Sequence, residues 1–322
     1  MPKITLQINL APNDYKHSRC LLQHQVDTWI TQVDEILLVY DLRRSKGRFG
    51  ENWNENHGKM MGLLAEFLVR YKKVVFKEVD YSVATQQEVG KYFFSNQTCP
   101  PKDYRGGPFY PYFYGLFAAA HEYVLHLDSD LFFGGQSATW MQEAVGLMRA
   151  NPDVLFCSPL PGPPRPDGLL VGQSAEVHPG KDRAFRFKGM STRIFLVNRK
   201  QLGAHKLKIA LPNFRSVVKA LVEGNPPYRL PENIISGMMQ ERQLVRVDFL
   251  GDEPGMWSVH PPYRTQDFYD KLPLLIKRIT ENTVPADQLG FYDMTDSLCD
   301  WTEARAKLAA NRWWKRLLPG KA

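Results

Sequence analysis

Short apolar runs alternate with longer amphipathic segments along most of the chain, and this alternation predicts an α/β fold. Residues 4–10 alternate apolar and polar side chains, which predicts a strand. Further strands, most of them short buried runs, are expected at residues 35–40, 74–79, 122–127, 154–157, 193–197 and 244–250. Such a series predicts a mostly parallel, Rossmann-type sheet flanked by helices.

Helical spacing lies between these strands. Helices are expected at residues 18–30, 57–72, 111–120 and 211–222, after Ser137, and from Pro231 onward. Residues 159–167 contain five prolines, which excludes an interior strand and predicts a loop over the sheet edge. After Thr265 the pattern becomes helical. We therefore expect a core domain over residues 1–264 and a helical C-terminal extension over residues 265–322.

Two carboxylates, Asp128 and Asp130, follow the strand at residues 122–127. Carboxylates at the end of a buried strand are unfavourable unless a positive group lies beside them. Mg²⁺ or Mn²⁺ suits this place because each takes one or two carboxylates together with waters and phosphate oxygens. An Asp-x-Asp triplet also occurs in turns and helix caps, but here it ends a strand of an α/β unit, where open sheets bind ligands.

Other polar residues are expected at the same edge. Asp41 follows the strand at residues 35–40, where it can hold a ribose or base or simply form a turn. Arg43, Arg44 and Arg48 come next and favour contact with a diphosphate, although a solvated basic loop is the alternative. Arg105 lies in a loop rich in Pro, Gly and aromatic residues, which we interpret as a wall of the site.

Two further candidates lie late in the chain. Glu232 falls in the first turn of the helix that begins near Pro231, where a carboxylate gains from the helix dipole or serves as a general base. His260 lies in a loop, where an imidazole is either merely exposed or a third ligand for Mn²⁺.

Composition narrows the class of protein. The chain has 322 residues and a net charge of +7, which suits a globular protein with a polyanionic partner or simply a soluble one. Its four cysteines show no metal or disulfide spacing, and no signal sequence or spanning run is evident, so we expect a cytoplasmic protein. The basic end around Trp313-Trp314 fits either peripheral attachment to an anionic membrane or docking on its own domain.

These motifs resemble nucleotide-sugar-dependent glycosyltransferases of the GT-A fold, closest to glycosyltransferase family 2, over residues 4–262. The resemblance rests on the first two strands, the run Leu125-His126-Leu127-Asp128-Ser129-Asp130, Pro231-Glu232-Asn233 and His260. It implies a GT-A-like fold and a metal-dependent transfer, with inversion, from a nucleoside-diphosphate sugar to a hydroxyl of a glycan, lipid-linked or small-molecule acceptor.

The resemblance also implies roles for individual residues. Asp128, Asp130 and His260 would hold the metal, with Asp128 also near the ribose, and Glu232 would deprotonate the acceptor. Asp41 would hold the nucleobase or ribose. The chain departs from the family in having Glu232-Asn233 where Glu-Asp is common, and in its first turn, Ala11-Pro12-Asn13-Asp14.

Two alternatives remain at the level of sequence. A nucleotidyltransferase acting on a sugar phosphate also uses acids at strand ends, but the chain lacks a phosphate-binding Gly-rich loop with lysine after its first strand. A non-enzymatic basic protein would bind polyanions in a salt-dependent manner. No RNA-recognition pattern of paired aromatic residues is present, so no nucleic-acid partner is expected.

Overall fold

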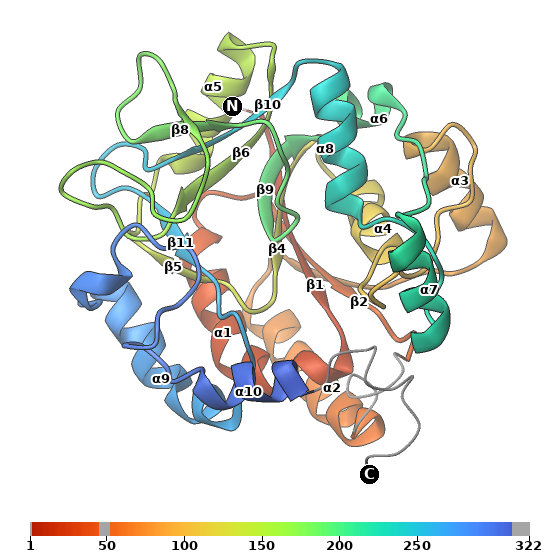
Figure 1. The fold of residues 1–322 in the computed structure, drawn as a ribbon, viewed down its shortest axis with the longest axis horizontal. Helices are drawn as coiled ribbons and strands as arrows, with labels where there is room; N and C mark the ends of the chain where they lie inside the picture. Colours follow the sequence, from red (N-terminus) through yellow and green to blue (C-terminus); the bar gives the residue numbers. More distant parts are fainter. Residues whose placement is uncertain (1, 45–51, 311–322) are drawn as a thin grey trace.

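The computed structural model describes residues 2–44 and 52–310, and its centre is one twisted sheet (Figure 1). The strand order is β3-β2-β1-β4-β9-β6-β10-β8-β7, and β11 joins β6 to β5. All strands run in one direction except β5, β8 and β9. The strands are β1 (Ile4–Leu10), β2 (Glu35–Tyr40), β3 (Val74–Glu78), β4 (Tyr123–Asp128), β5 (Phe132–Gly134), β6 (Val154–Pro161), β7 (Glu176–Val177), β8 (Ala184–Phe187), β9 (Ile194–Asn198), β10 (Val245–Phe249) and β11 (Trp257–Val259). The predicted α/β class with a mostly parallel sheet is confirmed.

Helices cover both faces of the sheet. One apolar cluster joins α1, α2 and α5 to one face, and a second joins α3, α4 and α8 to the other. The α-helices are α1 (Tyr15–Trp29), α2 (Trp53–Arg70), α3 (Val83–Phe93), α4 (Tyr110–Ala118), α5 (Trp140–Ala150), α6 (Arg199–His205), α7 (Phe214–Glu223), α8 (Pro231–Glu241), α9 (Gln266–Thr280) and α10 (Thr302–Ala310), with short 3-10 turns η1 (Pro12–Asp14) and η3 (Ala286–Gln288). Within the described residues, no helix combines the length and the apolar character needed to cross a membrane.

The segment after residue 264 packs on the sheet. Phe268, Leu272 and Leu275 of α9 lie in a third apolar cluster together with Phe132 of β5 and Trp257 of β11. This segment contains the helices α9 and α10, as predicted, but residues 281–301 between them hold only the short turn η3, and this stretch reaches the carboxyl edge of the sheet. The division at residue 264 stays a prediction. The basic end around Trp313-Trp314 lies outside the described residues.

The proline-rich stretch corrects one prediction. We expected a loop over residues 159–167, but β6 continues through Pro159 to Pro161 and pairs with β10 and β11. Leu160 and Gly162 donate their N–H groups to Met256 and Ser258 of the β11 side. Successive residues of a strand direct their backbone nitrogens to opposite sides. The nitrogens of Pro159 and Pro161, which carry no hydrogen, therefore point away from β11, and the prolines cost no hydrogen bond to that strand.

The parallel register brings the ends of three strands to one edge. Asn9 of β1 lies opposite Asp128 of β4, and Leu10 lies opposite Tyr40, the residue before Asp41. The acids predicted at the ends of β2 and β4 therefore share the carboxyl edge of the sheet, on either side of β1.

Candidate active site

The loop that carries the two acids is held from below by α1. The buried Gln25 amide donates to the backbone carbonyls of Asp128 and Leu131 at 3.2 and 3.1 Å. His17 lies 2.9 Å from the hydroxyl of Ser129. The backbone N–H of Asp128 bonds the Arg193 carbonyl at 2.7 Å. These contacts fix the loop, so that the orientation of both carboxylates is set before any ligand binds.

Asp130 is buried and faces a cation that the sequence did not indicate. The Arg264 guanidinium donates through Nε and Nη2 to Asp130 Oδ2 at 3.0 and 2.6 Å, whereas Oδ1 is buried with no hydrogen-bond partner. Burial alone would raise the pKa of Asp130, but Arg264, then His260 and His17, together hold it below its usual range. The carboxylate therefore stays charged throughout the neutral range.

Arg264 also contacts Asp14 at the end of η1. Its Nη1 lies 3.3 Å from Asp14 Oδ1. Burial raises the pKa of Asp14 to about 6, against the opposing effect of Arg264. Burial likewise lowers the pKa of His17 to about 3, so its imidazole is neutral. One arginine thus serves the buried Asp130 and the partly buried Asp14, and only Asp130 is firmly anionic.

His260 is oriented by a carboxylate on the C-terminal segment. Its Nδ1 lies 3.0 Å from Asp293 Oδ1, and its ring stacks on Tyr292 with centroids 6.0 Å apart. Because a carboxylate only accepts, Nδ1 donates to Asp293, and Nε2 on the other side of the ring lies 3.8 Å from Asp130 Oδ2. A histidine held in this way has the arrangement of a metal ligand with its supporting carboxylate.

These groups suit a metal that a bound substrate helps to hold. Among the described residues, no three Asp, Glu, His or Cys side chains lie close enough together to hold an ion unaided. Asp130 Oδ1 is nevertheless buried with no hydrogen-bond partner among the described residues, and His260 Nε2 lies 3.8 Å from the other oxygen of that carboxylate. Mg²⁺ and Mn²⁺ commonly complete such a set with waters and phosphate oxygens, so the donor set fits the predicted ion.

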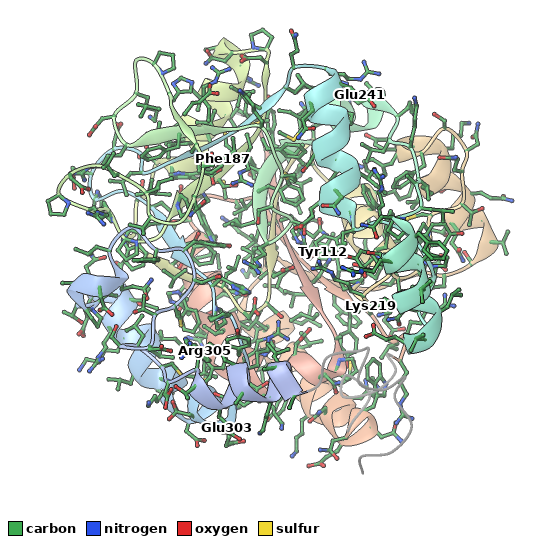
Figure 2. All side chains as sticks on the ribbon, viewed as in Figure 1. Tyr112, Phe187, Lys219, Glu241, Glu303 and Arg305 are labelled. Atoms are coloured by element: carbon green, nitrogen blue, oxygen red, sulfur yellow. The ribbon has the colours of Figure 1, made fainter. Side chains whose placement is uncertain are left out.

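Asp128 accepts a hydrogen bond from the other face of the sheet. The Tyr112 hydroxyl of α4, labelled in Figure 2, donates to Asp128 Oδ1 at 2.7 Å. α4 sits close to β1 because its Gly115 has no side chain: a Cβ there would collide with the amide of Gln7, which itself lies 3.3 Å from the Tyr112 carbonyl. Gly115 therefore sets the position of Tyr112, and Tyr112 that of Asp128.

The carboxylate of Asp41, the acid predicted after β2, already contacts other side chains of the protein. Its carboxylate accepts from the Tyr81 hydroxyl at 3.0 Å and lies 3.5 Å from Lys102 Nζ. The Arg43 guanidinium stacks on the Tyr81 ring, 5.1 Å from its centroid, and Arg44 is exposed. Arg48 lies outside the described residues. Asp41 is thus at the predicted edge but two strands from Asp130, where it accepts from the Arg43 backbone N–H at 2.8 Å and pairs with Lys102.

Glu232 lies in the first turn of α8, behind Pro231 as predicted. Burial raises the pKa of its carboxyl group, and the opposing positive groups are Arg193 first and Arg105 second. Arg193 connects this region to the acidic edge through its carbonyl bond to Asp128. The structure thus places Asp130 beside His260, with Asp128 in the same loop, and it places Glu232 within electrostatic reach of Arg193 and Arg105.

Several residues of this site were not predicted from the sequence. Arg264 lies only four residues after His260 in the same loop, so proximity in sequence was the available signal. Asp293 and Tyr292 had none, because they reach the site from a segment interpreted as an extension. Arg193 was assigned only to a strand.

Comparison with known proteins gives structural likeness alone. No protein-family model and no curated protein matches the chain. It is similar to S. aureus TarS 1–349 in complex with UDP-GlcNAc, with 12% identity and a TM-score of 0.40, over 85% of this chain and 65% of that one. It is also similar to the galactosyltransferase LgtC in complex with donor and acceptor sugar analogues, with 10% identity and a TM-score of 0.35, over 88% and 98% of the two chains.

Coverage of the TarS structures is partial. The chain spans 60% of the uncomplexed 1–349 structure and 39% of the longer TarS structure. With identities and TM-scores this low, chemistry must be derived from the side chains of this protein.

Proposed function

We propose that this protein is a metal-dependent glycosyltransferase that moves a sugar from a nucleoside-diphosphate sugar to an acceptor hydroxyl. The observation that supports it best is the fixed acidic loop after β4. There a buried, charged Asp130 keeps one oxygen without a partner in the described part of the chain, and its other oxygen lies 3.8 Å from Nε2 of a histidine whose Nδ1 donates to Asp293. Acids on a parallel-sheet edge with a second carboxylate at a helix start suit a diphosphate leaving group and a hydroxyl nucleophile.

The donor would lie along this edge. Asp130, Asp128 and His260 would hold Mn²⁺ or Mg²⁺ together with the diphosphate, and the ion, when bound, would offset negative charge on the leaving diphosphate. Asp41 would contact the ribose or base, with Arg43, Arg44, Arg48 and Arg105 available to the phosphates. Lys102 joins this set because it lies beside Asp41.

Glu232 would act as the base. The acceptor oxygen forms a bond to the anomeric carbon while the bond from that carbon to the diphosphate oxygen breaks. The diphosphate leaves with the electron pair, and the acceptor proton passes to Glu232. One displacement of this kind inverts the anomeric centre. A raised pKa makes Glu232 a better proton acceptor than an ordinary exposed carboxylate.

The remaining partners follow the same proposal. The acceptor would be a glycan, a lipid-linked molecule or a small metabolite. A basic C-terminal end would suit a cytoplasmic protein that associates with an anionic membrane surface.

Titration calorimetry with UDP-, GDP- and dTDP-sugars, with and without Mn²⁺, tests the proposal. We expect one donor to bind only with metal, and Asp130→Asn to weaken that binding by at least about tenfold. The control is Asp182→Asn, since the Asp182 side chain is 95% exposed. If no nucleotide sugar binds under any condition, or if both variants bind as the wild type does, the proposal is wrong.

A further inference from the structure

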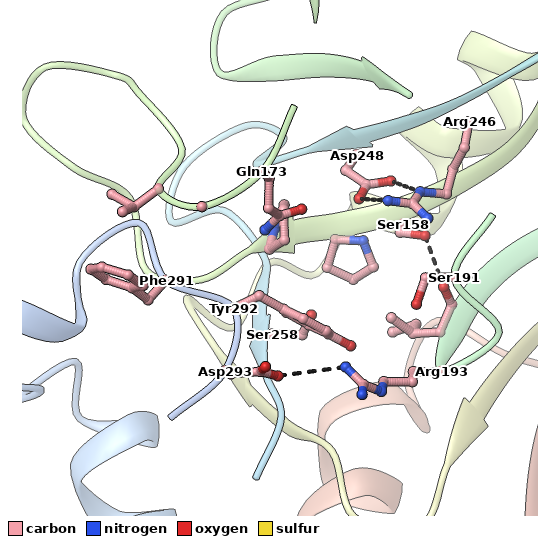
Figure 3. A pocket seen from close by; sticks show the side chains of 15 residues that line it. Ser158, Gln173, Ser191, Arg193, Arg246, Asp248, Ser258, Phe291, Tyr292 and Asp293 are labelled. Atoms are coloured by element: carbon pink, nitrogen blue, oxygen red, sulfur yellow. Dashed lines mark hydrogen bonds and ion pairs between the residues drawn. The ribbon is translucent and has the colours of Figure 1, made fainter. Parts of the chain in front are cut away.

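A cavity of about 410 Å³ opens beside the acidic edge (Figure 3). It lies over the carboxyl ends of β6 and β10, and its wall includes Arg193, Tyr292 and Asp293. Arg193 and Asp293 are the residues that contact Asp128 and His260, so the cavity and the acidic edge share a wall. The volume falls within the range of small-molecule sites, roughly 300–1,000 Å³.

Three polar atoms in this wall have no partner within residues 2–44 and 52–310. Gln173 Nε2, Ser258 Oγ and Tyr292 Oη are all buried and make no hydrogen bond to this part of the chain. They come from three separate segments, one of them β11, and all three residues line the same cavity (Figure 3). A buried polar atom without a partner is unfavourable, and a ligand with matching hydroxyl groups would relieve that cost.

The charges in the wall cancel. Arg246 and Asp248 form a buried bidentate pair at 2.7 and 3.0 Å, and Arg193 lies 3.5 Å from Asp293. The other lining residues are uncharged. The cavity therefore offers no unpaired cation to a phosphate or carboxylate and no unpaired anion to an amine. Besides these pairs, its wall carries hydroxyl, amide and aromatic side chains together with aliphatic residues such as Pro159, Val171 and Ile194.

We propose that this cavity binds a neutral saccharide, and that the sugar it binds is the acceptor of the transfer. Gln173, Ser258 and Tyr292 would bond its hydroxyl groups, and the volume suits a mono- or disaccharide. The second part rests on the proposed function, because only a donor at Asp130 makes the neighbouring sugar an acceptor. Arg193 lies between this cavity and Glu232, which puts the proposed base on the same side.

Saccharide binding tests the cavity without any donor. Ligand-observed NMR would compare neutral methyl glycosides and disaccharides of glucose, galactose, mannose and N-acetylglucosamine with glucuronic acid and glucose 6-phosphate. We expect a neutral saccharide to bind more tightly than its charged counterparts. Gln173→Ala and Tyr292→Phe should each weaken it by roughly 2- to 12-fold, the value of one hydrogen bond. Gln201→Ala, on the exposed surface of α6, should bind as the wild type does.

The outcomes separate the two proposals. The same titrations are repeated with Mn²⁺ and each of UDP, GDP and dTDP, because a donor can order the neighbouring wall. If no neutral saccharide binds in either condition, if charged sugars bind more tightly, or if the two cavity variants bind like Gln201→Ala, the cavity proposal is wrong. Saccharide binding without any nucleotide-sugar binding would keep the carbohydrate site and overturn the transferase.

Discussion

At the scale of single residues, the site depends on how each carboxylate is paired. Asp130 is paired with Arg264 and stays charged, and Asp14 shares that arginine and has a pKa of about 6. Glu232 has positive groups nearby but no direct partner among the residues that the structure describes. Three carboxyl groups with similar pKa values in water therefore have different pKa values in the folded protein, because their surroundings differ. Such separation is what an active site needs, because one acid must remain anionic while another exchanges a proton.

Glu232→Gln should abolish most turnover and leave donor binding intact. The amide keeps the size and polarity of the side chain but cannot accept the acceptor's proton, so we expect kcat to fall by roughly 10²–10⁴. Glu241→Gln is the matched control, because Glu241 ends the same helix and is exposed (Figure 2). Single-turnover assays and donor calorimetry give the two readouts. A variant with wild-type kcat would remove Glu232 from the chemistry.

At the scale of elements, the apolar pattern predicted the strands and helices correctly where a strand is buried or a helix is long. β2 has the predicted bounds, and α1 and α2 differ from their predicted ranges by only a few residues. The pattern failed for β5, β7 and β8, which have two to four residues each, too few to show a period. It also failed at Pro159, since the direction of a strand's N–H groups is fixed by its neighbours rather than by its own sequence.

The same distinction applies to the site. Asp128 and Asp130 could be predicted because they directly follow the apolar run at residues 122–127. The contact of Arg264 with Asp130 and that of Asp293 with His260 could not, since both form across long separations in sequence. The sequence pattern therefore identified the two acids, and the tertiary structure showed that Arg264 pairs with Asp130.

Gly115→Ala tests how closely α4 must approach β1. The new methyl group would meet the Gln7 amide, so we expect a loss of about 1–3 kcal/mol in the free energy of unfolding and a displaced Tyr112. Gly62→Ala in α2 is the opposite case, because nothing lies within 4 Å of its Cβ and alanine favours a helix, giving a gain of roughly 0.5–1 kcal/mol. Urea titration measures both. Equal stability of the two variants would contradict the close packing.

At the scale of the whole molecule, the chain closes its own site with its C-terminal part. α9 packs against the sheet through Phe268 and Leu272, and the segment beyond it brings Tyr292 and Asp293 to His260 and the cavity. Most of the net charge of +7 must therefore lie elsewhere, because the wall of the cavity is balanced and the loop after β4 is acidic. Stability of this arrangement depends on several buried ionisable groups, so it must vary with pH.

His24 makes part of that dependence measurable. Its Nε2 accepts a hydrogen bond from the Phe133 N–H at 2.9 Å, which requires the neutral ring, and burial lowers its pKa to about 4 from 6.5. The unfolded chain therefore binds a proton between these values that the folded chain does not, and stability contributed by neutral His24 is lost as pH falls from 6.5 towards 4. Glutamine can accept the same bond without titrating.

We therefore expect His24→Gln and the wild type to differ little at pH 7.5. At pH 4.5 the difference should shift in favour of the variant by up to about 2–3 kcal/mol, since two pH units below 6.5 correspond to that free energy for one proton. Urea denaturation at both values measures the shift, and NMR titration of the imidazole checks its pKa directly. Parallel stability profiles of the two proteins across this range would show that His24 is protonated as readily in the folded chain as in the unfolded one.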